Sequence, residues 1–300
     1  MAKNSSHAQS APIGVFDSGV GGLSVLRHLL RLMPHEHYLY LGDSARVPYG
    51  SKSPETVQLF ARQCAQFLLD RGVKLIVVAC NTASAVALDA VQAISPVPVV
   101  GMIQPAAQAA LTATRSGAIG IIGTRATVNS RAYPQAILGQ YEAGLSAQSL
   151  DAVDDLGGRL QVHGQACPLF VPIVEEGWTD HPAARLIAQD YLAPLGSLGI
   201  DTLVLGCTHY PLLAPLLADL LPHVTLIDCG EHAAWDARCI LENANQLASP
   251  NGTGPGAAAK IRFHLTDVPT TFEEVAQRFL GFPIATPQRV TIDHLCLETA

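Results

Sequence analysis

The sequence is short of charged, aromatic and basic residues, and these shortages exclude several classes of protein. Only 14% of its 300 residues are charged and 6% are aromatic, and 18 Lys and Arg face 25 Asp and Glu, for a net charge of -7. Such a chain lacks the basic surface that binds nucleic acid or an anionic membrane. No apolar run approaches the roughly 20 residues that span a bilayer. Residues 1–12 lack the apolar centre of a secretory signal, so we predict a disordered tail there.

A CxxC pair is also absent. The seven cysteines are odd in number and scattered along the chain: Cys64, Cys80, Cys167, Cys207, Cys229, Cys239 and Cys296. A disulfide framework is therefore not expected, and we predict a reducing, cytoplasmic location. The cysteines and histidines do not follow the standard spacing of zinc ligands, which disfavours a metal site.

What the sequence does contain is an alternation of short apolar runs with helical patterns. Runs at 13–16, 38–41, 75–79 and 97–103 are each separated by a helix-like segment. This alternation predicts an α/β fold whose parallel sheet is covered on both faces. The alternation starts again after residue 104, which predicts a second unit of the same class.

The later part of the chain gives weaker signals. We expect strands at 145–151 and 290–292, and irregular structure over 152–168. The clearest loop is at 248–258, which is rich in Gly and Pro.

Polar residues follow the apolar runs where strands are expected to end. Asp17 opens a glycine-rich turn, Tyr49 and Gly50 lie in a loop, and Thr124 and Thr127 follow a strand at 118–123. Taken singly, these residues suit helix caps or turns. Ligands of parallel sheets, however, bind outside the carboxyl ends of the strands.

Two apolar runs end in a cysteine followed by polar residues. One run leads to Cys80-Asn81-Thr82, and the other leads to Cys207-Thr208-His209. A thiol at a helix N-terminus has a lowered pKa, so we expect reactive thiolates.

The residues alone leave four roles open for this pair of cysteines. They could form a dithiol redox pair, or a metal site that includes His209. A Cys/His nucleophile is a third option. The fourth is two acid–base groups on opposite faces of one carbon, which would invert a stereocentre.

Several segments, in order along the chain, resemble the signature segments of the glutamate racemase family. They are Asp17–Gly22, Pro48–Gly50, Cys80–Thr82, Cys167–Pro172 leading to Glu175, and Gly206–Pro211. The likeness extends from about residue 13 to residue 280. The sequence Thr-His-Tyr-Pro after Cys207 is more similar to glutamate racemases than to their aspartate racemase relatives.

The resemblance implies two doubly wound α/β domains with parallel-rich sheets and an active site in the cleft between them. The first domain would comprise residues 1–103 plus 223–300, and the second would be inserted at 104–222. The implied activity is an isomerase that interconverts L- and D-glutamate without pyridoxal phosphate or another cofactor, for peptidoglycan and cell-wall synthesis. Glutamate is then the small-molecule partner, and a homodimer is an option. A related aspartate or other amino-acid racemase, and a binding protein without catalysis, are the alternatives.

The resemblance also implies roles for individual residues. Cys80 would face the α-proton of the D-isomer and Cys207 that of the L-isomer. Asp17, His209 and Glu175 would assist proton movement, although Glu176 is adjacent to Glu175 and competes for that role. The implied substrate-binding residues are Asp17, Ser18, Tyr49, Gly50, Asn81, Thr82, Thr124, Thr127, Thr208 and His209.

Overall fold

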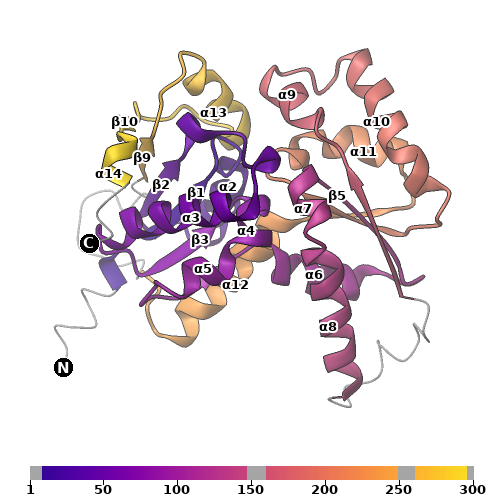
Figure 1. Ribbon diagram of the computed structural model, residues 1–300, viewed down its shortest axis with the longest axis horizontal. Coiled ribbons are helices and arrows are strands. Elements are labelled where there is room, and N and C mark those ends of the chain that lie inside the picture. The colour runs from indigo at the N-terminus through magenta and orange to yellow at the C-terminus, as the bar shows by residue number, and fades with distance from the viewer. Residues whose placement is uncertain (1–8, 147–159, 249–260, 296–300) are drawn as a thin grey trace.

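Two separate parallel sheets organise the chain in the computed structural model, which describes residues 9–146, 160–248 and 261–295 (Figure 1). The first sheet has the strand order β10-β9-β2-β1-β3-β4, and the second has the order β6-β5-β7-β8. The strands of the first sheet are β1 (Ile13–Asp17), β2 (Tyr38–Gly42), β3 (Leu75–Val78), β4 (Val99–Val100), β9 (Ile261–Leu265) and β10 (Gln288–Arg289). Those of the second are β5 (Ala118–Gly123), β6 (Gln161–Ala166), β7 (Thr202–Gly206) and β8 (Thr225–Asp228). The α/β fold with parallel sheets that the alternating pattern predicts is confirmed.

Helices cover the sheets. They are α2 (Leu23–Leu32), α3 (Pro54–Leu69), α4 (Asn81–Val86), α5 (Leu88–Gln92), α6 (Ile103–Ala113), α7 (Arg125–Asn129), α8 (Ala132–Ser146), α9 (Phe170–Glu175), α10 (Pro182–Gly196), α11 (Ala214–Leu220), α12 (Cys229–Asn243), α13 (Phe272–Leu280) and α14 (Ile292–Leu295). Short 3-10 helices are η1 (Ser44–Arg46), η2 (Tyr49–Ser51) and η4 (Tyr210–Leu213). None of the helices in the described part of the chain combines the length and apolar character that crossing a membrane requires.

Strand β2 shows why the first sheet is apolar on both faces. Successive side chains of a strand point to opposite faces. Accordingly, Tyr38 and Tyr40 join the core that contains α2, whereas Leu39 and Leu41 join the core that contains α3. This two-sided burial turns the strand sequence into a continuous apolar run.

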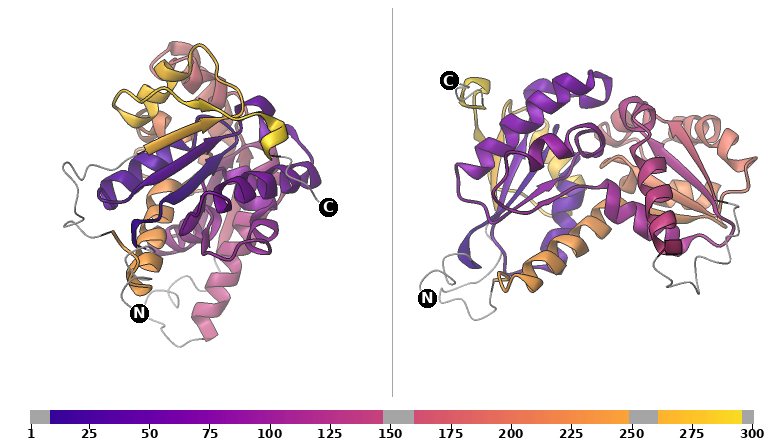
Figure 2. Two further views of the ribbon diagram at one scale, coloured as in Figure 1. Left: turned by 90° about the vertical axis from the view of Figure 1, so that its left-hand side faces the viewer. Right: turned by 60° about the horizontal axis from the view of Figure 1, so that its bottom comes forward.

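The chain leaves the first sheet after β4 and returns to it only at β9. Figure 2 shows the late strand β9, in yellow-orange, beside the early strand β2, with which it pairs in register. Strand β8, which lies just after the boundary expected at residue 222, pairs with β7 in the second sheet. Helix α12 follows β8 directly and packs against both α2 and α6, so it makes the return crossing.

Three predictions for the later part of the chain are wrong. Residues 145 and 146 belong to α8, while residues 147–151 lie outside the described residues. The segment taken as irregular contains β6, a half-exposed edge strand whose mixed composition gives no apolar run. Near the C-terminus, β10 ends at Arg289 and a helix begins at Ile292. The predicted tail lies mostly outside the described residues, but Gln9 is held, because its carbonyl accepts from Lys74 Nζ at 2.9 Å.

Candidate active site

The carboxyl ends of β1, β3 and β7 meet where the two units touch. Ser24, just after the glycine-rich turn, donates to the carbonyl of Thr208 at 2.8 Å. The turn itself is in tight contact with the second unit, since a Cβ on Gly21 would lie 2.2 Å from Thr208 Oγ1. Strand ends far apart in the sequence therefore form one site between the two units.

Cys80 lies at the N-cap of α4 and is 6% exposed. Its Sγ accepts the backbone N–H of Ala83 at 3.5 Å and lies 3.7 Å from Ser18 Oγ. The expectation of a lowered pKa is wrong for this thiol. Burial, and then the negative charge of Asp17, raise its pKa to about 12, because they outweigh the amide at the helix start. Cys80 is therefore a protonated thiol near neutral pH.

Asp17 lies at the end of β1, where the backbone N–H of Gly19 donates to its Oδ2 at 2.9 Å. Burial raises the pKa of the Asp17 carboxyl, although the charge of His209 opposes that effect. The pKa of the Asp17 carboxyl is raised, and its charge raises the pKa of the Cys80 thiol. The two groups are therefore suited to exchange a proton.

Cys207 ends β7 and is backed by a chain of polar contacts. Its Sγ lies 3.9 Å from His209 Nδ1, and His209 Nε2 lies 2.9 Å from Glu175 Oε1. Burial by itself would lower the pKa of His209. The hydrogen bonds to Cys207 and Glu175 reverse this and raise the pKa to about 10.

The local structure after Cys207 differs from the expected α-helix start. A turn and then the 3-10 helix η4 follow, so Cys207 is not at the N-terminus of an α-helix. Between the two adjacent glutamates, the structure places Glu175 against His209.

Three threonines from the two units hydrogen-bond to one another. Thr82 Oγ1 lies 2.9 Å from Thr124 Oγ1 and 3.2 Å from Thr127 Oγ1. Thr124 is also the N-cap of α7, since it accepts the N–H of Thr127 at 3.2 Å. The capping role and the position at the site therefore coexist.

Asn81 has a partner that the sequence did not indicate. Tyr133, from α8 in the second unit, donates to Asn81 Oδ1 at 2.5 Å and lies 2.9 Å from Cys229 Sγ. Tyr133 is one of two tyrosines in the ordinary helical pattern of α8, so no sequence signal distinguishes it.

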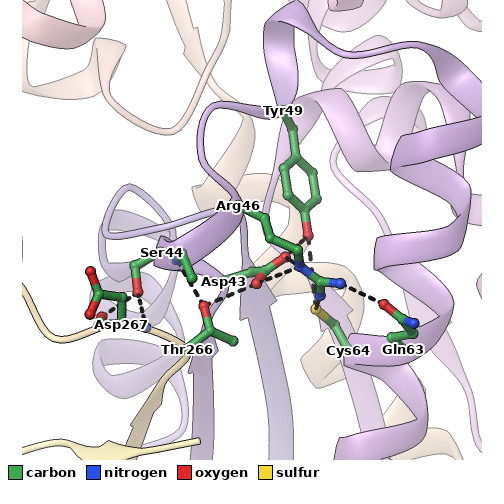
Figure 3. Close-up of polar contacts among 9 residues, drawn as sticks. Asp43, Ser44, Arg46, Tyr49, Gln63, Cys64, Thr266 and Asp267 are labelled. Atoms are coloured by element: carbon green, nitrogen blue, oxygen red, sulfur yellow. Dashed lines mark hydrogen bonds and ion pairs between the residues drawn. The ribbon is translucent and has the colours of Figure 1, made fainter. Parts of the chain in front are cut away.

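Tyr49 points its side chain toward Asp43, Arg46 and Cys64 (Figure 3). Its hydroxyl donates to the carboxylate of Asp43, and the side chain is 1% exposed. Asp43 also accepts from Arg46 Nε at 2.7 Å and from Thr266 Oγ1 at 3.0 Å. A substrate-binding role for Tyr49 stays a prediction, and the buried phenol leaves the backbone of this loop to serve it.

Gly50 brings that loop against the second unit. A Cβ at this position would lie 2.7 Å from Thr124 Cβ, so only glycine permits this approach. The hydrogen bonds of buried Asp43 with Tyr49, Arg46 and Thr266 hold this loop in place. The sequence gave no indication of this network, because Arg46 and Thr266 are 220 residues apart along the chain.

The comparisons with known proteins agree with this geometry. Residues 13–237 match the model of the Asp/Glu/Hydantoin racemase family. The chain belongs to this family. It is 46% identical to the glutamate racemase of Syntrophus aciditrophicus, over 97% of this chain and 100% of the relative. The family predicted from the motifs is confirmed.

Solved structures of racemases match the fold as well. Francisella tularensis glutamate racemase in complex with D-glutamate has a TM-score of 0.81 and 35% identity, covering 95% of this chain and 99% of that one. Thermus thermophilus glutamate racemase in complex with beta-chloro-D-alanine has a TM-score of 0.79 and 42% identity, covering 95% and 99%.

A metal site was one of the roles that the sequence left open for the two cysteines. Among the described residues, no cluster of three or more His, Cys, Asp or Glu is placed to hold a metal ion. Lys74 lies directly before β3, at the edge of the sheet opposite Cys80, and pairs with Glu36 at 2.6 Å.

Proposed function

We propose that this racemase interconverts L-glutamate and D-glutamate by a two-base mechanism in which Cys80 and Cys207 act on opposite faces of the α-carbon. The observation that carries the proposal is the pairing of two buried thiols, each with its own proton-exchanging partner. Asp17 raises the pKa of Cys80, and His209 with Glu175 backs Cys207. The glutamate racemases among its relatives support the choice of substrate.

The proton movements balance in each direction. From L-glutamate, the imidazolium of His209, which its pKa of about 10 favours, holds Cys207 as a thiolate. The resulting thiolate removes the α-proton, and the Cys80 thiol donates its proton to the opposite face. From D-glutamate, Cys80 gives its proton to Asp17, and Cys207 takes a proton from the His209 imidazolium. The Cys80 thiolate then removes the α-proton, and the Cys207 thiol reprotonates the carbon. After either turnover, proton exchange with solvent returns the two thiols and their partners to their starting states.

The two carboxylates and the ammonium of glutamate need different partners. Backbone amides and hydroxyls can hold carboxylates, and a carboxylate can pair with an ammonium. We assign the carboxylate contacts to Ser18, Asn81, Thr82, Thr124, Thr127, Thr208 and His209 and to the backbone of Tyr49 and Gly50, and the ammonium contact to Asp17. Fixed dipoles in a site without bulk water then stabilise the carbanion-like transition state.

The decisive experiment is solvent-deuterium incorporation at the α-carbon. The purified protein in deuterium oxide should convert either enantiomer of glutamate into the other and label the α-position of the product. Absence of label and of racemisation from both enantiomers would instead favour a binding protein. The same assay with D-aspartate separates the alternative substrate, because turnover of aspartate above that of glutamate contradicts the assignment.

We further propose that the enzyme works in the cytoplasm, supplies D-glutamate for peptidoglycan, and forms a homodimer. The six cysteines in the described residues are free, which suits a reducing compartment. Growth of a D-glutamate-requiring bacterial strain that expresses the protein tests the supply role. Light scattering of the purified protein tests the dimer.

A further inference from the structure

Helix α13 belongs to the first unit but faces the second. It packs against α2, and Figure 1 shows it opposite α9 at the top of the gap between the two units. Arg278 spans that gap, because its Nη1 donates to the backbone carbonyl of Glu175 at 2.6 Å. Glu175 is the residue whose carboxylate holds His209.

The contact between Arg278 and Glu175 caps the C-terminus of a helix. Glu175 is the last residue of α9, and a cation stabilises the free carbonyls at a helix C-terminus. The guanidinium lies over Gly177, which has φ of 72°, and a Cβ there would lie 2.9 Å from Arg278 Cζ. The other Nη of Arg278 pairs with Glu274 one turn earlier on α13, which holds the guanidinium in place.

The next residue of the same helix contacts His209 itself. The ring of Phe279 is fully buried and meets the imidazole edge-on, with centroids 5.3 Å apart and an angle of 87° between the planes. Two consecutive residues of α13 therefore hold the two partners of the His209–Glu175 pair. No contact in the described residues joins Arg278 to Cys80 or Asp17.

We infer that Arg278 is a positioning residue for the Cys207 half of the site. By binding the end of α9, it keeps Glu175 within hydrogen-bonding reach of His209 when the two units are closed. This inference rests on the proposed function, since it concerns one of the two proposed bases. Helix α13 contains none of the signature segments, so the proposed function by itself gives Arg278 no role.

The inference predicts an effect on one base only. In Arg278→Met, proton transfer at Cys207 slows and transfer at Cys80 does not. A misplaced group can cost roughly 10- to 100-fold in rate, and we expect kcat to fall by that amount. Because the two enantiomers have equal free energy, kcat/KM must fall equally in both directions, so rates alone cannot reveal the asymmetry.

Kinetic isotope effects can reveal it. With α-deuterated L-glutamate, Cys207 removes the deuteron, and its slower step should raise the primary isotope effect on kcat/KM. With α-deuterated D-glutamate, Cys80 removes the deuteron, and the isotope effect should fall toward unity. Recovered D-glutamate should then also exchange its α-deuteron with solvent before it is converted.

Three further variants sharpen the test. Arg278→Lys keeps the charge and should restore part of the activity. Gly177→Ala displaces the guanidinium without removing it and should give the same asymmetry. Arg238→Met is the matched control: this arginine also pairs with a glutamate one turn away, Glu242, and reaches a carbonyl, that of Leu32, but it lies on α12. It should leave both isotope effects unchanged.

The outcomes separate the two proposals. Isotope effects in Arg278→Met and Gly177→Ala that change equally for both enantiomers, or not at all, overturn the positioning role. Wild-type protein that racemises neither enantiomer overturns the proposed function instead. Thermal unfolding of each variant verifies that the protein assayed is folded.

Discussion

The two cysteines differ in what surrounds them, although their positions at strand ends are alike. Cys80 has a carboxyl group nearby, which raises its pKa together with burial, whereas Cys207 has an imidazole 3.9 Å away. One thiol is thus paired with an acidic residue and the other with a basic one. In the proposed mechanism, each thiol with its partner serves one enantiomer of the substrate.

Replacement of either thiol tests this pairing. In Cys80→Ser and Cys207→Ser we expect racemisation to be nearly abolished, because a serine hydroxyl is a far weaker acid than a thiol. Each variant retains one thiol and should still exchange the α-proton of one enantiomer with deuterium oxide: L-glutamate for Cys80→Ser, D-glutamate for Cys207→Ser. The measurement is α-deuterium content by NMR. Near-wild-type turnover in both variants would contradict the two-base reading.

The raised pKa of His209 predicts a pH dependence of stability. The folded-state pKa of about 10 exceeds the ordinary 6.5, so the folded protein binds more protons than the unfolded chain between these values. The stabilisation from His209 is therefore fully present below about 6.5 and is lost as pH rises through about 10. The difference in free energy of unfolding between wild type and His209→Asn should shrink between about pH 6 and about pH 9. Urea unfolding measures it, and a pH-independent difference would contradict the assignment.

At the scale of elements, the glycine-rich turn after β1 sets how closely the two units approach. A methyl group on Gly21 would lie 2.2 Å from Thr208 Oγ1 and 2.6 Å from the ring of His209. Both contacts are closer than atoms can lie, so the turn or the second unit must shift.

Gly21→Ala should therefore lower kcat by an order of magnitude or more, since it displaces the residues beside Cys207. Gly139→Ala is the matched control. Gly139 is exposed in α8 with no atom within 4 Å of the added methyl, so this change should raise the free energy of unfolding by about 0.5–1 kcal/mol without affecting activity. Steady-state kinetics and urea unfolding of both variants check the pair. Full activity in Gly21→Ala would show that the turn is not a rigid contact.

At the scale of the whole molecule, a buried ion pair lies on the side of the first sheet away from the site. Lys74 and Glu36 lie 2.6 Å apart with side chains 3% and 2% exposed. Lys74 also donates to the carbonyls of Gln9 and Gln246, so it connects segments that are far apart in the sequence.

Lys74→Met should lower the free energy of unfolding by about 3–5 kcal/mol, because it leaves Glu36 buried without its partner. The double variant Glu36→Met/Lys74→Met should lose less, since apolar side chains of similar size replace both charges. Activity per folded molecule should stay unchanged in both, because the pair lies far from Cys80 across the sheet. Chemical unfolding provides the measurement, and a double variant that is less stable than the single one would contradict this account.

The sequence by itself determined the strand ends and the family. Apolar runs that stop at Asp17, Cys80 and Cys207 follow from local composition, and parallel strands bring such ends to one edge of a sheet. The glycine-rich turn and the loop of Gly50 are also local features, because close backbone approach requires glycine wherever it occurs.

Tertiary structure alone decided how these residues are held. It selected Glu175 over Glu176 and turned Tyr49 toward Asp43. It also supplied Tyr133 and Arg278, which lie in ordinary helical patterns, and assigned β8 to the second sheet. The raised pKa of Cys80 depends on burial by residues distant in the sequence, and no local pattern carries that information. The physical reason is that sequence spacing specifies where a strand ends, whereas burial, partners and their distances arise only when separate segments pack together.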